Sequence, residues 1–315
     1  MKSSAEWPNQ EIFMITSFEE LLDKARLGPK VTVAVAAADD EAALGAVAAA
    51  HELGMADALL FGDRDKIRTM YETLFGSGEM PFQIRDAAEE AAARSAVAAV
   101  RSGEAHILLK GKIKTAALLK AVLDSEHGLR SSHLLSDLFV FEEPSRPGNK
   151  LVMITDGGVT LKPDLKQKIE IIENAVAVAR ALGNEKPLVA VLSAVETVNP
   201  ALPATIDAAV LTKMNQRGQI KGCIIDGPLA LDNAVSSEAA ALKGIESPVA
   251  GKADILLCPE IESANMLAKS TTYFARLRLG HVIMGSTAPV LIPSRADSTD
   301  SKLLSIAIGK LICTR

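Results

Sequence analysis

Residues 289–300 read Pro-Val-Leu-Ile-Pro-Ser-Arg-Ala-Asp-Ser-Thr-Asp, and this stretch decides how the rest of the chain is interpreted. Its apolar start predicts a short buried strand, and the pattern over residues 302–311 predicts a helix after it. The polar residues between them include one hydroxyl, one guanidinium and two carboxylates of interest, those of Ser294, Arg295, Asp297 and Asp300. In α/β proteins ligands bind where strands end, and the N-terminus of the next helix favours anions. We therefore expect an oxyanion-binding loop with a carboxylate that moves a proton; a polar loop whose aspartate only caps the helix is the alternative.

Length and composition indicate a soluble α/β enzyme. At 315 residues the chain is long for one core, which predicts two domains. Hydrophobic residues make up 48% and aromatic residues only 3%, and the net charge is −5. Nucleic-acid binding is not expected, because it needs a basic surface and stacking platforms. Since no apolar run has the length of a membrane span and residues 1–10 lack a signal-peptide core, we expect a cytoplasmic protein without membrane contact.

No motif in the sequence indicates a metal or a resident cofactor. The three cysteines, Cys223, Cys258 and Cys313, are widely spaced, and we interpret them as reduced thiols of the core. The five histidines show no ligand spacing, and we expect each to be solvated or structurally satisfied. The glycine-rich dinucleotide fingerprint, the H-E-x-x-H motif and the G-x-S-x-G elbow are all absent from the sequence.

Strand-like and helix-like segments alternate along the chain. The predicted strands cover residues 31–37, 58–61, 105–109, 134–141, 151–155, 188–192, 222–225 and 255–258. The predicted helices cover residues 40–53, 87–101, 115–123, 165–182, 204–214 and 263–279. This alternation predicts mainly parallel sheets that are covered on both faces. The proline- and glycine-containing break at residues 142–148 is the predicted domain boundary.

Several predicted strands of the second half end in polar groups. These ends are Asp156-Gly157-Gly158, Ser193, Asp226-Gly227-Pro228 and Pro259-Glu260. A single such residue usually caps a helix or forms a turn. Several of them together predict a cleft, because parallel strands bring their C-terminal ends to one side of a sheet.

Many segments, taken together and in order, resemble the phosphate acetyl/butyryltransferase family. They are residues 155–159, 162–168, 191–196, 205–209, 225–234, 253–256, 259, 265–270 and 294–298. The resemblance is dense over about residues 150–311 and looser over the first half, through residues 109–123. Asp226-Gly227-Pro228-Leu229 and Ser294-Arg295-Ala296-Asp297 are more similar to the butyryl enzymes than to the acetyl enzymes.

The resemblance implies an enzyme that moves a short acyl group reversibly between coenzyme A and inorganic phosphate. Transfer would be direct, in a ternary complex of acyl-CoA and phosphate, with butyryl as the acyl group and acetyl as the alternative. No bound cofactor is implied, since coenzyme A is a substrate. Two further functions stay open: a nicotinamide-dependent oxidoreductase of the same fold superfamily, and a non-catalytic binding protein. The oxidoreductase would need a metal-binding aspartate cluster and an adenosine-binding loop, neither of which the sequence displays.

The resemblance also implies an architecture. We expect two α/β domains with mainly parallel sheets, like those of isocitrate and isopropylmalate dehydrogenases, and an active site in the cleft between them. The C-terminal segment would return to the first domain, so that residues 1–146 plus 286–315 form one domain and residues 147–285 the other. A homodimer or larger homo-oligomer is implied, with residues 263–279 and 302–311 either at its interface or in the core.

Each residue type of the loop suits one part of this reaction. Arg295 would hold phosphate with its planar fork, and Ser294 would donate a hydrogen bond to the developing oxyanion. A carboxylate would take the thiol proton. The acetyl enzymes place this aspartate seven residues after the serine, where this chain has Ser301, so the base is open: Asp300 is the first choice and Asp297 the second. The substrate-binding candidates are Lys114, Thr115, Asp156, Thr160, Asn265 and Lys269.

Overall fold

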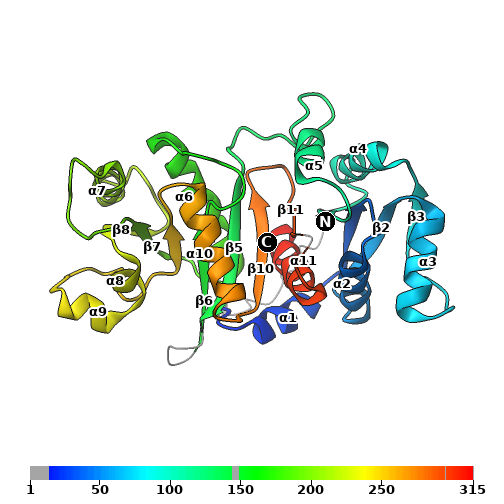
Figure 1. Cartoon of the computed structure of the whole chain (residues 1–315), viewed down its shortest axis with the longest axis horizontal. Helices are drawn as coiled ribbons and strands as arrows, with labels where there is room; N and C mark the ends of the chain where they lie inside the picture. Colours follow the sequence, from blue (N-terminus) through cyan, green and yellow to red (C-terminus); the bar gives the residue numbers. More distant parts are fainter. Residues whose placement is uncertain (1–13, 144–148, 295, 315) are drawn as a thin grey trace, which may run out of the picture.

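The computed structural model describes residues 14–143, 149–294 and 296–314. Within them, eleven strands form one continuous sheet in the order β3-β2-β1-β4-β11-β10-β5-β6-β9-β7-β8. Helices cover both faces of this sheet, and the molecule is elongated across its strands (Figure 1). The sheet is mixed and mainly parallel, which confirms the predicted α/β class.

The first part of the chain builds one end of the sheet from parallel strands. They are β1 (Val31–Ala36), β2 (Ala56–Gly62), β3 (Gln83–Asp86) and β4 (Ile107–Lys110). The helices are α1 (Phe18–Arg26), α2 (Glu41–Glu52), α3 (Arg64–Phe75), α4 (Glu89–Arg101) and α5 (Thr115–Val122). Ser17, Asp40 and Asp63 fix the starts of α1, α2 and α3, because each side chain accepts a backbone N–H of the first turn.

The second part builds the other end. Its parallel strands are β6 (Lys150–Thr155), β7 (Leu188–Leu192), β8 (Ile224–Leu229) and β9 (Ile255–Leu257). Its helices are α6 (Leu165–Ala181), α7 (Pro203–Gln216), α8 (Leu231–Val235), α9 (Ser237–Leu242) and α10 (Ile261–Tyr273). Asp164 and Gln167 form a capping box that starts α6.

Three central strands and the last helix join the two ends. β5 (Ser136–Glu143) runs antiparallel to both β6 and β10 (Leu279–Met284), and β10 runs antiparallel to β11 (Val290–Leu291). β11 in turn lies parallel to β4. α11 (Thr299–Cys313) follows β11 and packs on α1, α2 and β10. The last residues of the chain therefore lie against its first part.

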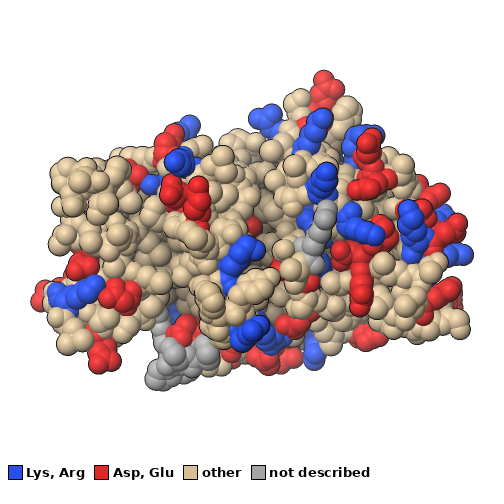
Figure 2. Space-filling model, in the orientation of Figure 1, with Lys and Arg blue, Asp and Glu red and all other residues tan. Residues whose placement is uncertain are grey.

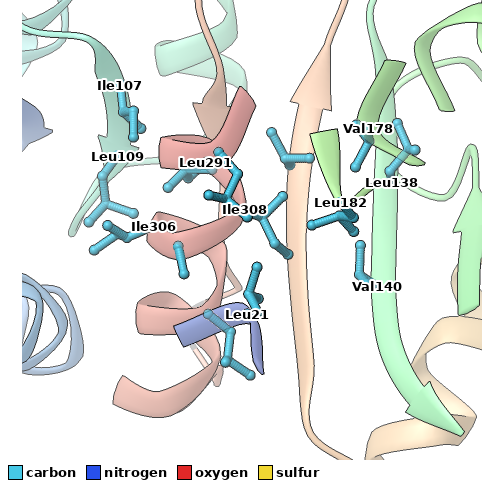
Figure 3. Packing of buried hydrophobic residues seen from close by; sticks show 14 of the residues in the cluster. Leu21, Ile107, Leu109, Leu138, Val140, Val178, Leu182, Leu291, Ile306 and Ile308 are labelled. Carbon is cyan, nitrogen blue, oxygen red and sulfur yellow. The ribbon is translucent and has the colours of Figure 1, made fainter. Parts of the chain in front are cut away.

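A hydrophobic core under α11 connects these elements. Figure 3 shows side chains of α11, next to Leu291 of β11, between those of β4 on one side and those of β5 and α6 on the other. The labelled residues are Leu21, Ile107, Leu109, Leu138, Val140, Val178, Leu182, Leu291, Ile306 and Ile308. Residues 302–311 thus belong mostly to the core, and the loop between β11 and α11 rests on a packed support.

The predicted helix over residues 263–279 is wrong at its end. α10 stops at Tyr273, and residues 279–284 form the central strand β10. Gly280 does not terminate a helix: it lies in β10, where a Cβ would come within 3.0 Å of Ile308 Cδ1. The absence of a side chain at Gly280 lets α11 approach the sheet closely. The elements α1, α3, β3, α8 and α9 are also absent from the prediction.

Two further expectations concern the domain boundary and the cysteines. The boundary at residue 146 lies outside the described residues, so the division into residues 1–146 plus 286–315 and 147–285 stays a prediction. Cys223 and Cys258 are buried and free, and burial raises their pKa values to about 11 and about 12. Cys313 is exposed at the end of α11, so its assignment to the core is wrong.

None of the helices in the described part of the chain has the length and apolar character to span a membrane.

Candidate active site

The loop between β11 and α11 forms a closed turn. The Ser294 backbone N–H donates to Asp297 Oδ2 at 2.7 Å, and the Asp297 N–H donates to the Ser294 carbonyl oxygen at 3.1 Å. Ser298 caps α11 by accepting the Ser301 N–H, so the alternative that an aspartate serves only as the N-cap is wrong. The Ser294 side chain is exposed at this turn. Arg295 lies outside the described residues.

Asp297 is the carboxylate that the turn places beside Ser294. Its side chain is 24% exposed, and Oδ2 lies 3.7 Å from His281 Nε2. Behind the turn, the buried Lys302 Nζ lies 3.4 Å from the Asp297 carbonyl oxygen and 3.5 Å from Asp40 Oδ1. Lys302 therefore anchors the backbone of the turn to the start of α2 and leaves the Asp297 carboxylate available.

Asp300, the first choice for the base, has another contact. Arg278 Nε and Nη2 donate to its two carboxylate oxygens at 2.9 and 2.8 Å. Arg278 also pairs with Glu19 of α1 at 2.6 Å, and the Asp300 carboxylate raises the pKa of the guanidinium. Asp300 thus ties the first turn of α11 to the segment before β10, whereas Ser301 takes part in the helix cap.

His281 is a site residue that the sequence interpretation missed. It is buried on β10, its Nδ1 lies 3.1 Å from Asp137 Oδ1, and its ring stacks on Phe139 with a centroid distance of 5.2 Å. Its Nε2 has no hydrogen-bond partner among the described residues, so the expectation of a satisfied histidine is wrong here. Burial alone would lower the pKa of His281, but the charges of Asp137 and Asp297 outweigh burial and raise it. Recognising residues 279–284 as a strand would have placed His281 and Ile283 on one face of the sheet.

Asp156 organises the loop that follows β6. Its buried carboxylate accepts backbone N–H groups at 2.8–3.1 Å from Asp137, Gly158, Val159 and Thr160. Burial raises the pKa of Asp156, although the N–H groups of Gly158, Asp137 and Thr160 oppose this change. Thr160 Oγ1 donates to the Leu135 carbonyl oxygen. Asp156 and Thr160 therefore hold the loop and the start of β5 together.

The other predicted substrate-binding residues lie in two places. Asn265 Nδ2 donates to the Gly157 carbonyl oxygen at 2.9 Å, which attaches α10 to the Asp156 loop. Lys269 is exposed one turn further along α10. Lys114 is exposed at the start of α5, and the half-buried Thr115 is its first residue.

Two of the cavities in the described residues are lined by charged side chains of the first part of the chain. One of 740 Å³ lies where β1, β2 and β3 end, and is lined by Ala37, Asp39, Gly62, Asp63, Lys66, Asp86, Ala87, Ala88, Glu89 and Lys112. The other, of 540 Å³, lies between α4 and α5 and is lined by residues that include Arg94, Ile113, Lys120 and His127. The ends of parallel strands are the usual place for a nucleotide in such sheets. In the described residues, His, Cys, Asp and Glu side chains form no group of three or more that could hold a metal ion.

Known proteins resemble this chain in sequence and in structure. The model of the family described as "Phosphate acetyl/butaryl transferase" matches residues 67–309. A phosphate acetyltransferase of Thermotoga maritima is 47% identical over 92% of this chain and 98% of its own length. A phosphate butyryltransferase of Clostridium acetobutylicum is 45% identical over 95% of this chain and 99% of its own length.

The solved structures agree with the sequence relatives. A branched-chain phosphotransacylase from Enterococcus faecalis superposes with a TM-score of 0.78 at 34% identity, covering 90% of this chain and 99% of that one. A putative 4-hydroxythreonine-4-phosphate dehydrogenase from Salmonella typhimurium superposes with a TM-score of 0.55 at 13% identity, which shows the fold alone. The predicted family is therefore confirmed: this chain belongs to the phosphate acetyl/butyryl transferase family and is a phosphate acyltransferase.

Proposed function

We propose that this enzyme transfers a butyryl group reversibly between coenzyme A and inorganic phosphate, directly and within a ternary complex. The observation that supports the site is the single turn that joins an exposed serine to a carboxylate at the N-terminus of the 15-residue α11. Acetyl is the second candidate, because relatives named for acetyl and for butyryl transfer are almost equally similar to this chain.

Phosphate would bind at the start of α11. The first backbone N–H groups of a helix and its dipole favour an anion there. Arg295 precedes this helix by four residues in the sequence, and its guanidinium suits bidentate contact with phosphate. The Ser294 hydroxyl would donate to the carbonyl oxygen of the acyl group, on which negative charge grows during attack.

Asp297 is the better candidate for the base. Hydrogen phosphate loses a proton when it becomes acyl phosphate, and the departing sulfur of coenzyme A gains one. A carboxylate beside the reacting groups can carry this proton. Asp297 accepts the Ser294 N–H in the same turn, whereas Asp300 is bound at both oxygens by Arg278.

Coenzyme A would bind along the first part of the sheet. The cavities of 740 and 540 Å³ lie at strand ends and beside α5, within the region of the lysines that follow β4. Lys112, Lys114 and Lys120 are exposed there and would meet the phosphates of coenzyme A. The acyl end of acyl-CoA would meet the second part of the chain. There it would contact the Asp156 loop and α10, which carries Asn265 and Lys269.

We further propose a cytoplasmic homodimer or larger homo-oligomer without a resident cofactor, built from the two predicted domains. Figure 2 shows few charged side chains over α7, where Ile206 and Val210 are exposed. On α10, Met266 and Tyr273 are also exposed. Exposed apolar side chains of this kind suit contact between protein chains. Light scattering after size-exclusion chromatography tests the oligomeric state.

The decisive assay is phosphate-dependent release of the coenzyme A thiol from acetyl-, propionyl- and butyryl-CoA, without added metal or nicotinamide. We expect turnover with all three and the highest kcat/KM with butyryl-CoA. A preference for acetyl-CoA would replace the proposed acyl group but keep the reaction. No phosphate-dependent thiol release with any of the three would refute the proposed function.

A further inference from the structure

The side chain of His281 lies next to the turn that carries Asp297. Its Nδ1 is 3.1 Å from Asp137 Oδ1, and its Nε2 is 3.7 Å from Asp297 Oδ2. We propose that His281 is a positioning residue that takes from Asp297 the proton lost by hydrogen phosphate and returns it for delivery to the sulfur of coenzyme A. This inference rests on the proposed function.

The surroundings of His281 leave one of its nitrogens for this task. Its ring is fixed by stacking on Phe139, and its backbone N–H donates to Ser305 Oγ at 2.9 Å. Asp137 binds Nδ1, but Nε2 is buried and has no hydrogen-bond partner among the described residues. A buried polar nitrogen without a partner is costly for a purely structural side chain. A shift of less than about 1 Å would bring Asp297 Oδ2 and Nε2 within hydrogen-bond distance.

Asp137 is itself held firmly in place. Its N–H donates to Asp156 Oδ1 at 3.0 Å, and its carbonyl oxygen accepts Thr155 Oγ1 at 3.0 Å. A Cβ at Gly158 would overlap Asp137 Oδ2, so the Asp156 loop packs directly on this carboxylate. The loop after β6 therefore packs against Asp137 and holds it in place beside His281.

The charges around the pair favour the imidazolium without making it permanent. Asp137 on β5 and Asp297 after β11 favour the charged ring, and Lys110 at the end of β4 opposes it. Asp156 accepts the backbone N–H of Asp137, and Lys302 of α11 donates to the carbonyl oxygen of Asp297. The net effect raises the pKa of His281 above its ordinary value of 6.5.

A histidine beside the carboxylate makes the removal of the proton less unfavourable. Transfer of a proton from a thiol with a pKa of about 8.5 to a carboxylate with a pKa of about 4 is unfavourable. Transfer to an imidazole whose pKa lies above about 6.5 is less unfavourable, because the two pKa values differ less. In each turnover one C–O bond forms between phosphate and the acyl carbon, and one C–S bond breaks. The proton moves from hydrogen phosphate through Asp297 to His281, and back through Asp297 to the sulfur. No oxidant or further reactant is needed.

Two substitutions separate this role from a merely structural one. His281→Asn keeps an amide group near Nδ1 for Asp137, and His281→Gln places one near Nε2 for Asp297; neither group titrates. The measurement is kcat/KM against pH for acyl phosphate plus CoA, recorded for the wild type and for each variant; substrate ionisation is the same for all three enzymes, so differences between their profiles come from the protein. Wild-type activity should rise with pH through the pKa of His281, because the imidazolium cannot accept a proton. In both variants this acid limb should move to lower pH by more than one unit, and kcat should fall about 100-fold.

A matched pair elsewhere provides the control. His51 Nδ1 lies 2.7 Å from Asp57 Oδ1 at the surface, and His51→Gln should change neither kcat nor the acid limb. An acid limb that stays in place in His281→Gln overturns the proposal, even where kcat falls. Should both His281 variants unfold, Asp137→Asn replaces them, since removal of that charge should also move the limb to lower pH. An inactive wild type would refute the proposed function instead.

Discussion

The loop after β6 and the loop after β11 each contain an aspartate, but the two carboxylates have different surroundings. The buried Asp156 carboxylate accepts four backbone N–H groups. The Asp297 carboxylate is partly exposed, accepts the Ser294 N–H and lies near His281 Nε2. A carboxylate whose lone pairs are occupied holds a loop, whereas one with remaining acceptor capacity can take a proton. The comparison favours a stabilising role for the first loop and supports the proposed chemical role of the second.

The largest effect should come from Asp297→Asn. The amide has the shape of the carboxylate and its oxygen can still accept the Ser294 N–H, so the turn should persist. Because the amide cannot take a proton, kcat should fall by about 10²–10⁴-fold. Steady-state thiol release measures the loss, and an unchanged melting temperature shows that the fold is intact. Activity within about threefold of wild type would remove Asp297 from the role of base.

Ser294→Ala should produce a loss of about 10²–10³-fold in kcat, because it removes one donor to the oxyanion. Ser236→Ala is the matched control, since the Ser236 side chain caps another helix, α9, by accepting the Ala239 N–H. The control should cost about 1 kcal/mol of stability and leave kcat near the wild-type value. Equal losses of kcat in both variants would mean that loss of stability, not removal of the Ser294 hydroxyl, lowers the rate.

Asp156→Asn should act mainly on stability. An amide offers one acceptor oxygen and turns an NH₂ group toward backbone N–H donors, so buried hydrogen bonds are lost. We expect the free energy of unfolding to fall by about 2–4 kcal/mol, measured by urea denaturation. Asp164→Asn, at the exposed capping box of α6, should cost well below that amount. A catalytic defect in Asp156→Asn without loss of stability would contradict the division between the two loops.

The sequence is sufficient to predict the family, the fold class and the position of the polar loop between a short strand and the last helix, because these depend on segments that are contiguous in the chain. Residues 289–300 lie together in sequence and stay together in space. The partner of Asp297 cannot be found in this way, because His281 lies in a strand that is not predicted from the sequence: only a helix over residues 263–279 is expected there, with Gly280 as its stop. Alternating side chains of β10 point to opposite faces, and Gly280 has the pattern of a helix stop although it accommodates α11. Asp137 reaches His281 only through the pairing of β5 with β10.

The smallest effect should come from Asp300→Asn, and it decides which of the two aspartates, Asp297 or Asp300, is the proposed base. Asp300 and Arg278 have side chains that are 44% and 37% exposed, so solvent screens their pairing. We expect a loss below about 1 kcal/mol in unfolding free energy that shrinks at high salt. Because Arg278 also pairs with Glu19, α1 stays attached, and kcat should remain within about threefold of wild type. A loss of 100-fold or more, with Asp297→Asn still active, would return the role of base to Asp300 and make the turn around Ser294 a structural feature.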